Sequence, residues 1–135
     1  MGSHQRLKPA HTGFRHVWYA TVYSLRGLRA AWTWESAFRQ EFALAVLALP
    51  LGFWLGQTPA ERAVLVGCML LVLVVELLNS AIEATIDRIG HDYDPDAGRA
   101  KDLGSAAVMT SLMIAGLVWL IVLWDRLFAV DGWFA

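Results

Sequence analysis

A polar stripe with helical spacing interrupts an apolar run that is long enough to cross a bilayer. The run extends from Ala63 to Ile82, and the stripe begins inside it at a glutamate. A carboxylate at membrane depth costs about 2.5 to 3.5 kcal/mol on insertion scales, so a segment that keeps one normally uses it or pairs it. The stripe is therefore the predicted working surface. Its members are Glu76, Asn79, Ser80, Glu83 and Asp87.

The spacing of the stripe divides its carboxylates by depth. At about 100° per residue, four of the five side chains share a narrow arc and Asn79 flanks it. At a rise of about 1.5 Å per residue, Glu83 lies about 10 Å nearer the membrane face than Glu76. Glu76 then suits a general base for a membrane-embedded hydroxyl, and Glu83 suits a hydrated cation. The alternative is that the stripe only joins helices through hydrogen bonds.

Further charged residues would meet the stripe at this membrane face. Glu35 would reach the level of Glu83 and complete a magnesium site, because Mg²⁺ takes one or two carboxylates together with phosphate oxygens. A dense cluster of charged residues at 87–102 follows the stripe. Its aspartates could bind a ligand, or they could simply be exposed to solvent. At its end Lys101 would reach phosphate as a point charge, with Ser105 close behind. Because the sequence has neither a P-loop nor a Gly-x-Gly-x-x-Gly motif, nucleotide binding needs another architecture.

The composition predicts an all-α integral membrane protein. The chain has 135 residues, of which 57% are hydrophobic and 17% charged, with seven tryptophans. This is one domain's worth of sequence and too apolar for an ordinary soluble domain. Three stretches approach the ~20 residues that a spanning helix needs, although the first contains Pro50. The predicted spans are about 36–56, 62–88 and 100–125.

An amphipathic helix is predicted ahead of the first span, at about 13–33. Large apolar residues fall on one side of its helical projection, and arginines and tyrosine fall on the other, a pattern typical of interfacial helices. Two roles stay open for it, a membrane anchor and a lid or substrate gate. Residues 1–12 are expected to be disordered or to derive partly from an expression tag, and 13–135 to form a single membrane domain. The apolar side comprises Phe14, Trp18, Leu25, Leu28 and Trp32.

The distribution of positive charge predicts the orientation. Arg62 and Arg126 fall on one side of the spans, and the other nine Lys and Arg residues fall on the opposite side. The positive-inside rule then places the N-terminus and the 87–102 loop in the cytoplasm.

Small residues mark the expected helix contacts. They include a line on the third span and pairs on the other two. Three helices enclose a polar stripe poorly, so an oligomer that buries Glu76 between subunits is the economical arrangement. On the third span the line comprises Gly104, Ala107, Ser111 and Ala115.

The chain also contains four segments in a recognisable order: 27–32 with Glu35, 37–41, 76–83 and 98–107. Together they resemble the prokaryotic diacylglycerol kinase family, over roughly residues 13 to 124 and without gaps. The resemblance implies a three-span enzyme with a surface helix, working as a homotrimer in the bacterial inner membrane. It implies transfer of the ATP γ-phosphate to diacylglycerol, giving phosphatidic acid. The expected partners are ATP, diacylglycerol, the bilayer and further copies of the chain, and no nucleic acid.

The resemblance also implies roles for individual residues. Glu76 would be the general base, with Asn79 supporting the catalytic centre. Glu35 and Glu83 would be ligands of the magnesium ion that accompanies ATP. Where the family commonly has an arginine early in the surface helix, this chain has His16 beside Arg15, and both are assigned to nucleotide phosphate. The other nucleotide contacts would be Tyr23, Glu35, Glu83, Asp92, Tyr93, Asp94, Lys101 and Asp102. Lipid contacts would be Arg29, Trp32, Glu41, Trp54 and Ser105.

Three alternatives are weighed against this function. An undecaprenol kinase shares the central motif, but the 29–41 segment favours the diacylglycerol branch. A small proton-coupled exporter would also carry a lone intramembrane glutamate. It would not need acidic residues and Lys101 gathered at one membrane face. The last alternative is a purely structural membrane assembly protein.

Overall fold

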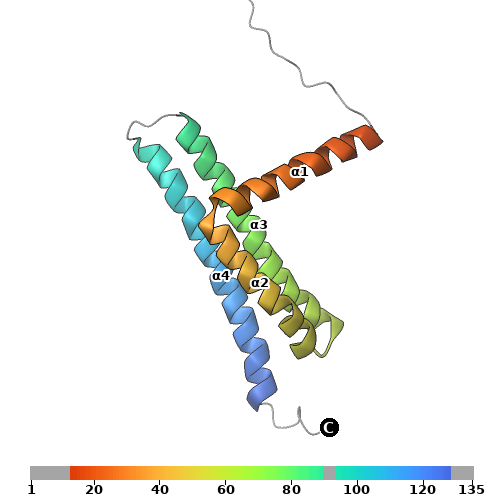
Figure 1. Ribbon diagram of the computed structural model, residues 1–135. Coiled ribbons are helices and arrows are strands. Elements are labelled where there is room, and N and C mark those ends of the chain that lie inside the picture. The colour runs from red at the N-terminus through yellow and green to blue at the C-terminus, as the bar shows by residue number, and fades with distance from the viewer. Residues whose placement is uncertain (1–12, 90–93, 129–135) are drawn as a thin grey trace, which may run out of the picture.

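The computed structural model describes residues 13–89 and 94–128. This part of the chain forms four helices, α1 (Phe14–Trp34), α2 (Ser36–Leu55), α3 (Pro59–Ile89) and α4 (Pro95–Phe128). Helices α2, α3 and α4 are long and apolar enough to cross a membrane, which confirms the predicted all-α membrane class. The three helices pack as one bundle, and α1 projects sideways from the start of α2, while α3 and α4 continue past this corner (Figure 1).

Helices α3 and α4 extend a few residues beyond the predicted spans, whereas α2 ends one residue before the predicted end; the largest difference is at the start of α4. Asp94 begins this helix, since its Oδ1 accepts a hydrogen bond from the Asp96 backbone N–H at 2.9 Å. Pro95 occupies the first helical position, where a missing N–H costs nothing. The predicted 87–102 loop is therefore partly helical, and Lys101 lies on a helix rather than in a loop.

A single residue separates α1 from α2. Glu35 has an extended backbone, with φ −102° and ψ 112°, and its N–H donates to the Ala31 carbonyl at 2.9 Å. Arg39 of α2 donates from Nη1 to the carbonyls of Trp32 at 3.0 Å and Thr33 at 3.4 Å. These carbonyls have no partner inside a helix that ends here. The guanidinium therefore fixes the corner between the two helices.

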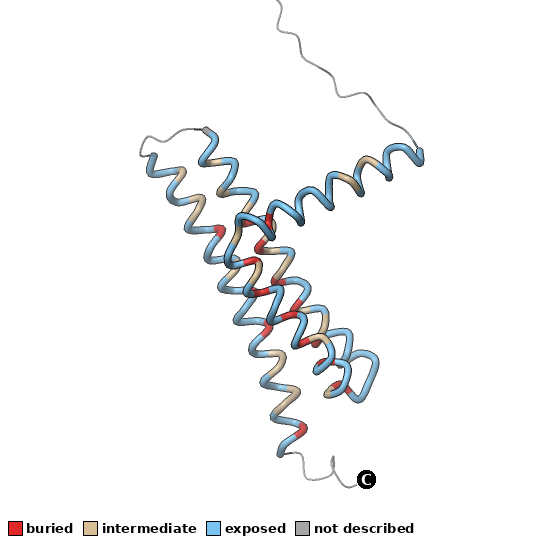
Figure 2. The backbone as a smooth tube through the Cα atoms, viewed as in Figure 1, coloured by how far each residue is buried: buried red, intermediate tan, exposed pale blue. Residues whose placement is uncertain are grey.

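The bundle has a thin core along α3. The buried cluster comprises Ala48, Met69, Val72 and Ala115, and many large apolar residues are exposed. Most of the backbone in Figure 2 accordingly carries the colour of exposed residues. This suits a protein whose outer surface contacts lipid rather than water. On α4, Gly104, Ser111 and Ala115 are buried as predicted, but Ala107 is exposed. Ala107 lies about 60° around the helix from Gly104, which carries it off the buried line.

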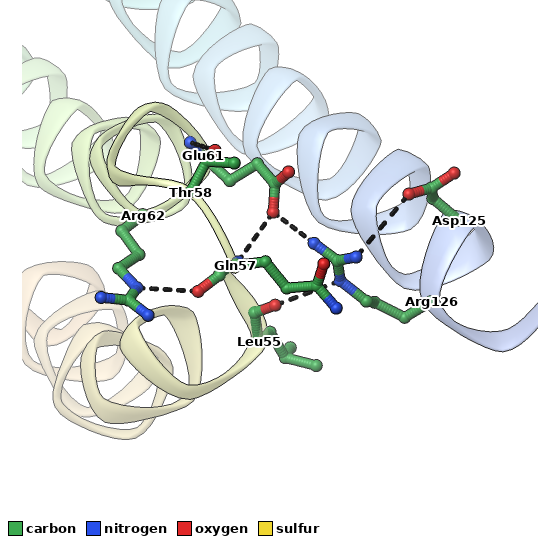
Figure 3. Close-up of polar contacts among 8 residues, drawn as sticks. Leu55, Gln57, Thr58, Glu61, Arg62, Asp125 and Arg126 are labelled. Carbon is green, nitrogen blue, oxygen red and sulfur yellow. Dashed lines mark hydrogen bonds and ion pairs between the residues drawn. The ribbon is translucent and has the colours of Figure 1, made fainter. Parts of the chain in front are cut away.

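The end of the bundle opposite α1 is joined by a polar cluster (Figure 3). Arg126 of α4 forms an ion pair with Glu61 of α3, and its Nε donates to the Leu55 carbonyl of α2 at 3.2 Å. Glu61 also accepts a hydrogen bond from the Gln57 backbone N–H at 2.9 Å. Because the Arg126 side chain is only 10% exposed, water replaces these bonds poorly. One guanidinium therefore ties the ends of three helices together.

Replacing Arg126 with Gln is expected to lower the free energy of unfolding by about 1 to 3 kcal/mol. The amide cannot form the charged bonds, and Glu61 is left without its cation. Reversible unfolding in mixed micelles measures the change. Asp125→Asn is the matched control, because the Asp125 side chain is 67% exposed and lies 3.9 Å from the same guanidinium. Equal losses in both variants would contradict a special role for Arg126.

Candidate active site

Three members of the polar stripe of α3, Glu76, Asn79 and Glu83, line a cavity of about 360 Å³ near the α1–α2 corner. The stripe lies between two helices rather than facing one, because α2 and α4 both contribute to the wall. Five of the residues predicted for the site meet here, namely Glu35, Glu76, Asn79, Glu83 and Ser105. The wall also contains Ser36, Ala37 and Val108, which the sequence pattern did not indicate.

Carboxylates dominate the electrostatics of this region. Glu76 is 3% exposed, and it lies close enough to Glu35 and Glu83 for their charges to interact. Glu41 of α2 is also buried and interacts with the charge of Glu76. Its Oε2 has no hydrogen-bond partner among the described residues. Like charges gathered in this way repel each other, so a bound cation would stabilise the site.

Asn79 joins the deep and shallow parts of the stripe. Its Nδ2 donates to Oε1 of Glu83 at 3.1 Å, and the asparagine is buried against α4. A carboxylate held by such a bond keeps a fixed orientation toward the cavity. The amide therefore supports Glu83 directly.

Lys101 lies outside the cavity wall and is held by Asp87. Its Nζ donates to Oδ1 of Asp87 at 2.5 Å, which joins α4 to the last turns of α3. The charge of Glu83 also acts on this ammonium group. Lys101 thus stays near the carboxylates without contacting the cavity. Asp87 continues the stripe and could have been matched to the lysine by opposite charge, but the pattern alone gave it no partner.

Several predicted nucleotide contacts are not brought to the cavity within one chain. Arg15, His16 and Tyr23 lie on α1, which extends away from the bundle (Figure 1). Asp94 and Asp102 are exposed at the start of α4 and do not line the cavity. The remaining two predicted contacts, Asp92 and Tyr93, lie outside the described residues.

The predicted lipid contacts are also spread along the molecule. Glu41 and Ser105 lie near the stripe, whereas Arg29 is exposed on α1. Trp32 packs edge-on against the Phe42 ring, with centroids 5.5 Å apart. Trp54 is 71% exposed near the far end of α2. At ~1.5 Å per helical residue, Trp54 lies about 28 Å along α2 from Glu35, which lines the cavity.

The oxygen donors at the cavity fit a magnesium ion that is bound together with phosphate. Glu35, at the junction of α1 and α2, and Glu83 of α3 carry carboxylates, which are the hard oxygen donors that Mg²⁺ prefers. Across residues 13–89 and 94–128, no group of three His, Cys, Asp or Glu side chains is placed to hold a metal by itself. Mg²⁺ commonly completes its shell with water and substrate phosphate, so two protein carboxylates are sufficient.

Comparison with known sequences decides the family. The family profile described as prokaryotic diacylglycerol kinase matches residues 22–123. The chain belongs to the prokaryotic diacylglycerol kinase family. This confirms the resemblance carried by the motifs. The matched range includes every residue that lines the cavity, and it leaves out Arg15 and His16.

Curated relatives in the prokaryotic diacylglycerol kinase family are similar over most of their length. A diacylglycerol kinase from Escherichia coli is 49% identical over 115 residues, which covers 85% of this chain and 94% of the relative. One from Pseudomonas aeruginosa is 45% identical over 112 residues, covering 83% and 91%. One from Helicobacter pylori is 40% identical over 113 residues, covering 84% and 88%.

Proposed function

We propose that this chain phosphorylates diacylglycerol with ATP and releases phosphatidic acid. The observation that carries the proposal is the meeting of Glu35, Glu76 and Glu83 around one cavity, in a family whose relatives are named diacylglycerol kinase. The cavity lies toward one end of three membrane-capable helices, where a lipid alcohol and a water-soluble nucleotide can meet. A lone carboxylate for proton coupling would not require this arrangement.

Glu76 takes the proton of the lipid hydroxyl in this proposal. The hydroxyl oxygen forms a bond to the γ-phosphorus of ATP, the bond from that phosphorus to the bridging oxygen breaks, and ADP leaves. The proton ends on the Glu76 carboxylate. Burial of Glu76 keeps water away from the reacting phosphoryl group, which favours transfer to lipid over hydrolysis.

Glu35 and Glu83 would hold magnesium at the shallow side of the cavity. When bound with ATP, the ion neutralises charge on the phosphates. Asn79 keeps the Glu83 carboxylate in place through its amide, and Asp87 keeps Lys101 near the same region. Phosphoryl transfer depends mainly on such positioning and on charge neutralisation, so these residues contribute by holding the reactants.

We further propose a homotrimer in the bacterial inner membrane. Support comes from the predicted nucleotide residues of α1, because this helix extends away from the bundle and none of these residues lines the cavity of its own chain. A neighbouring subunit would supply them. The end of the bundle that carries α1 would face the cytoplasm, because nine of the eleven Lys and Arg residues belong to that side.

A lipid phosphorylation assay tests the activity. Purified protein in vesicles is given Mg-ATP carrying a labelled γ-phosphate, with diacylglycerol, undecaprenol or neither lipid. We expect label to enter diacylglycerol. Label in undecaprenol alone would assign the chain to the alternative kinase, and no transfer by folded protein would contradict both kinase functions. The Glu76→Gln variant provides the background value.

The surface helix is expected to be needed for activity on long-chain diacylglycerol. Trp18 and Leu25 are 68% and 61% exposed on α1, so they are free to enter the headgroup layer. Replacing both with Gln should leave the protein folded but lower the rate by ~100-fold, because a ~1 Å misplacement of binding groups can cost that much. Ser24→Gln on the same helix is the control. Full activity of the double variant in bilayers, with α1 shown to be detached from the membrane surface, would show that the helix serves only as an anchor.

A further inference from the structure

Helix α4 approaches α3 very closely where Gly104 meets Asn79. A Cβ atom added at Gly104 would overlap Oδ1 of Asn79 and lie 3.3 Å from its Cγ. The same Cβ would be 3.9 Å from the Asn79 Cα, which is an ordinary van der Waals distance. The two helix backbones therefore leave room for a methyl group at this point. The amide of Asn79, in its present orientation, does not.

The orientation of this amide is set by Glu83. Nδ2 donates to Oε1 of Glu83, which directs the amide oxygen toward α4. That oxygen has no hydrogen-bond partner among the described residues, and Asn79 is only 8% exposed. A buried amide has few other positions available, so displacing the oxygen also displaces the nitrogen.

We propose that Gly104 is a positioning residue of the site. Its missing side chain lets Asn79 lie against α4 and hold Glu83 toward the cavity. The inference rests on the proposed function, in which Glu83 belongs to the magnesium–nucleotide site. Gly104 acts through Asn79 and touches neither substrate nor cation. Any side chain at this position turns the amide away and releases the carboxylate.

A purely structural role for Gly104 predicts a different result. If the glycine only allowed the helices to pack, Gly104→Ala would separate α3 from α4 and weaken the fold. The 3.9 Å spacing to the Asn79 backbone argues against this, and alanine favours a helix more than glycine does. We therefore expect Gly104→Ala to keep its stability while its cation site changes.

The chain allows a direct measurement of the amide. Asn79 is its only asparagine, so isotope-labelled asparagine gives the two proton signals of one side-chain amide in an NMR spectrum of the full-length protein in micelles. In Gly104→Ala, the proton that is bonded to Glu83 should move toward its position in Glu83→Ala. The matched control is Gly116→Ala on the same helix, where an added Cβ meets nothing within 4 Å. An unchanged Asn79 signal in Gly104→Ala would overturn the proposal.

Cation binding without turnover gives the second readout. Using Mn²⁺ as the probe, with a non-hydrolysable ATP analogue, Gly104→Ala should weaken binding by about 10- to 100-fold, as is typical when the partner of a metal ligand is lost. The double variant with Asn79→Ala should bind no worse than Asn79→Ala alone, because both changes break the same contact. Additive losses would show that Gly104 acts independently of Asn79 and would overturn the inference.

Two further outcomes separate the inference from the proposed function. If wild-type protein binds no cation with nucleotide, the proposed function fails, and the NMR signal still decides whether Gly104 positions the amide. If Gly104→Ala does not fold but the double variant with Asn79→Ala does, the overlap with the amide is the cause and the inference is supported. If neither folds, Gly104 serves helix packing and the inference fails.

Discussion

Replacing Glu76 with Gln is expected to lower turnover by about 100- to 10,000-fold, the range typical of general-base catalysis. The amide has nearly the same shape as the carboxylate, so packing around this buried side chain is preserved. It cannot accept the proton of the lipid hydroxyl. Binding of Mg-ATP should remain close to that of the wild type. Steady-state rates with diacylglycerol and calorimetric titration with a non-hydrolysable ATP analogue measure the two effects separately.

Asp96→Asn is a suitable control for the loss of one carboxylate. Asp96 is exposed and pairs with Arg99 of the same helix at 3.0 Å, outside the cavity wall. Its variant should keep the wild-type turnover. A near-native rate for Glu76→Gln would exclude Glu76 as the base. Loss of nucleotide binding in that variant would instead move Glu76 into the metal site.

Glu83→Gln is expected to raise the magnesium concentration needed for half-maximal activity by about 10- to 100-fold. A glutamine oxygen can still accept the bond from Asn79, so the change removes the charge and leaves the local geometry in place. ATP affinity should fall with magnesium affinity, and excess magnesium should recover part of the rate. Magnesium titrations at several ATP concentrations measure both constants.

Asp87→Asn separates the metal site from the lysine beside it. This variant weakens the hold on Lys101 and should reduce ATP affinity while leaving the magnesium requirement nearly unchanged. Superimposable magnesium titrations for Glu83→Gln and wild type would show that Glu83 is structural. Equal shifts for the two variants would show that the stripe responds only to net charge.

The parts of the site that follow from one helix were predictable from the sequence. The spacing from Glu76 to Glu83 places these side chains together on any regular helix, and the expected level at the membrane face, together with the motifs, added Glu35 and Ser105. Contacts between helices were not predictable in this way. The ion pair between Asp87 and Lys101 depends on where α4 begins and on its register against α3. No periodicity contains that information.

The spacing of small residues predicted the helix contacts only in part. It placed Gly104 on the contact side of α4, but it could not show that the facing group is the amide of Asn79. The polar cluster at the far end of the bundle was not predicted, for another reason. Arg126 was counted only for orientation, and its partner Glu61 is 65 residues earlier in the chain. The roles assigned to α1 came from family resemblance, which gives a function for each residue and not the subunit that it serves.

Because a single residue, Glu35, joins α1 to α2, the number of residues at this corner determines how α1 is rotated relative to the bundle. Inserting a single residue near the end of α1 would rotate the rest of that helix by about 100° and advance it by about 1.5 Å. Trp18 and Leu25 would then leave the side that they share in the present structure. We expect the corner to tolerate substitutions but not insertions or deletions. A reporter fused ahead of residue 13 preserves this phase, whereas one placed between α1 and α2 destroys it.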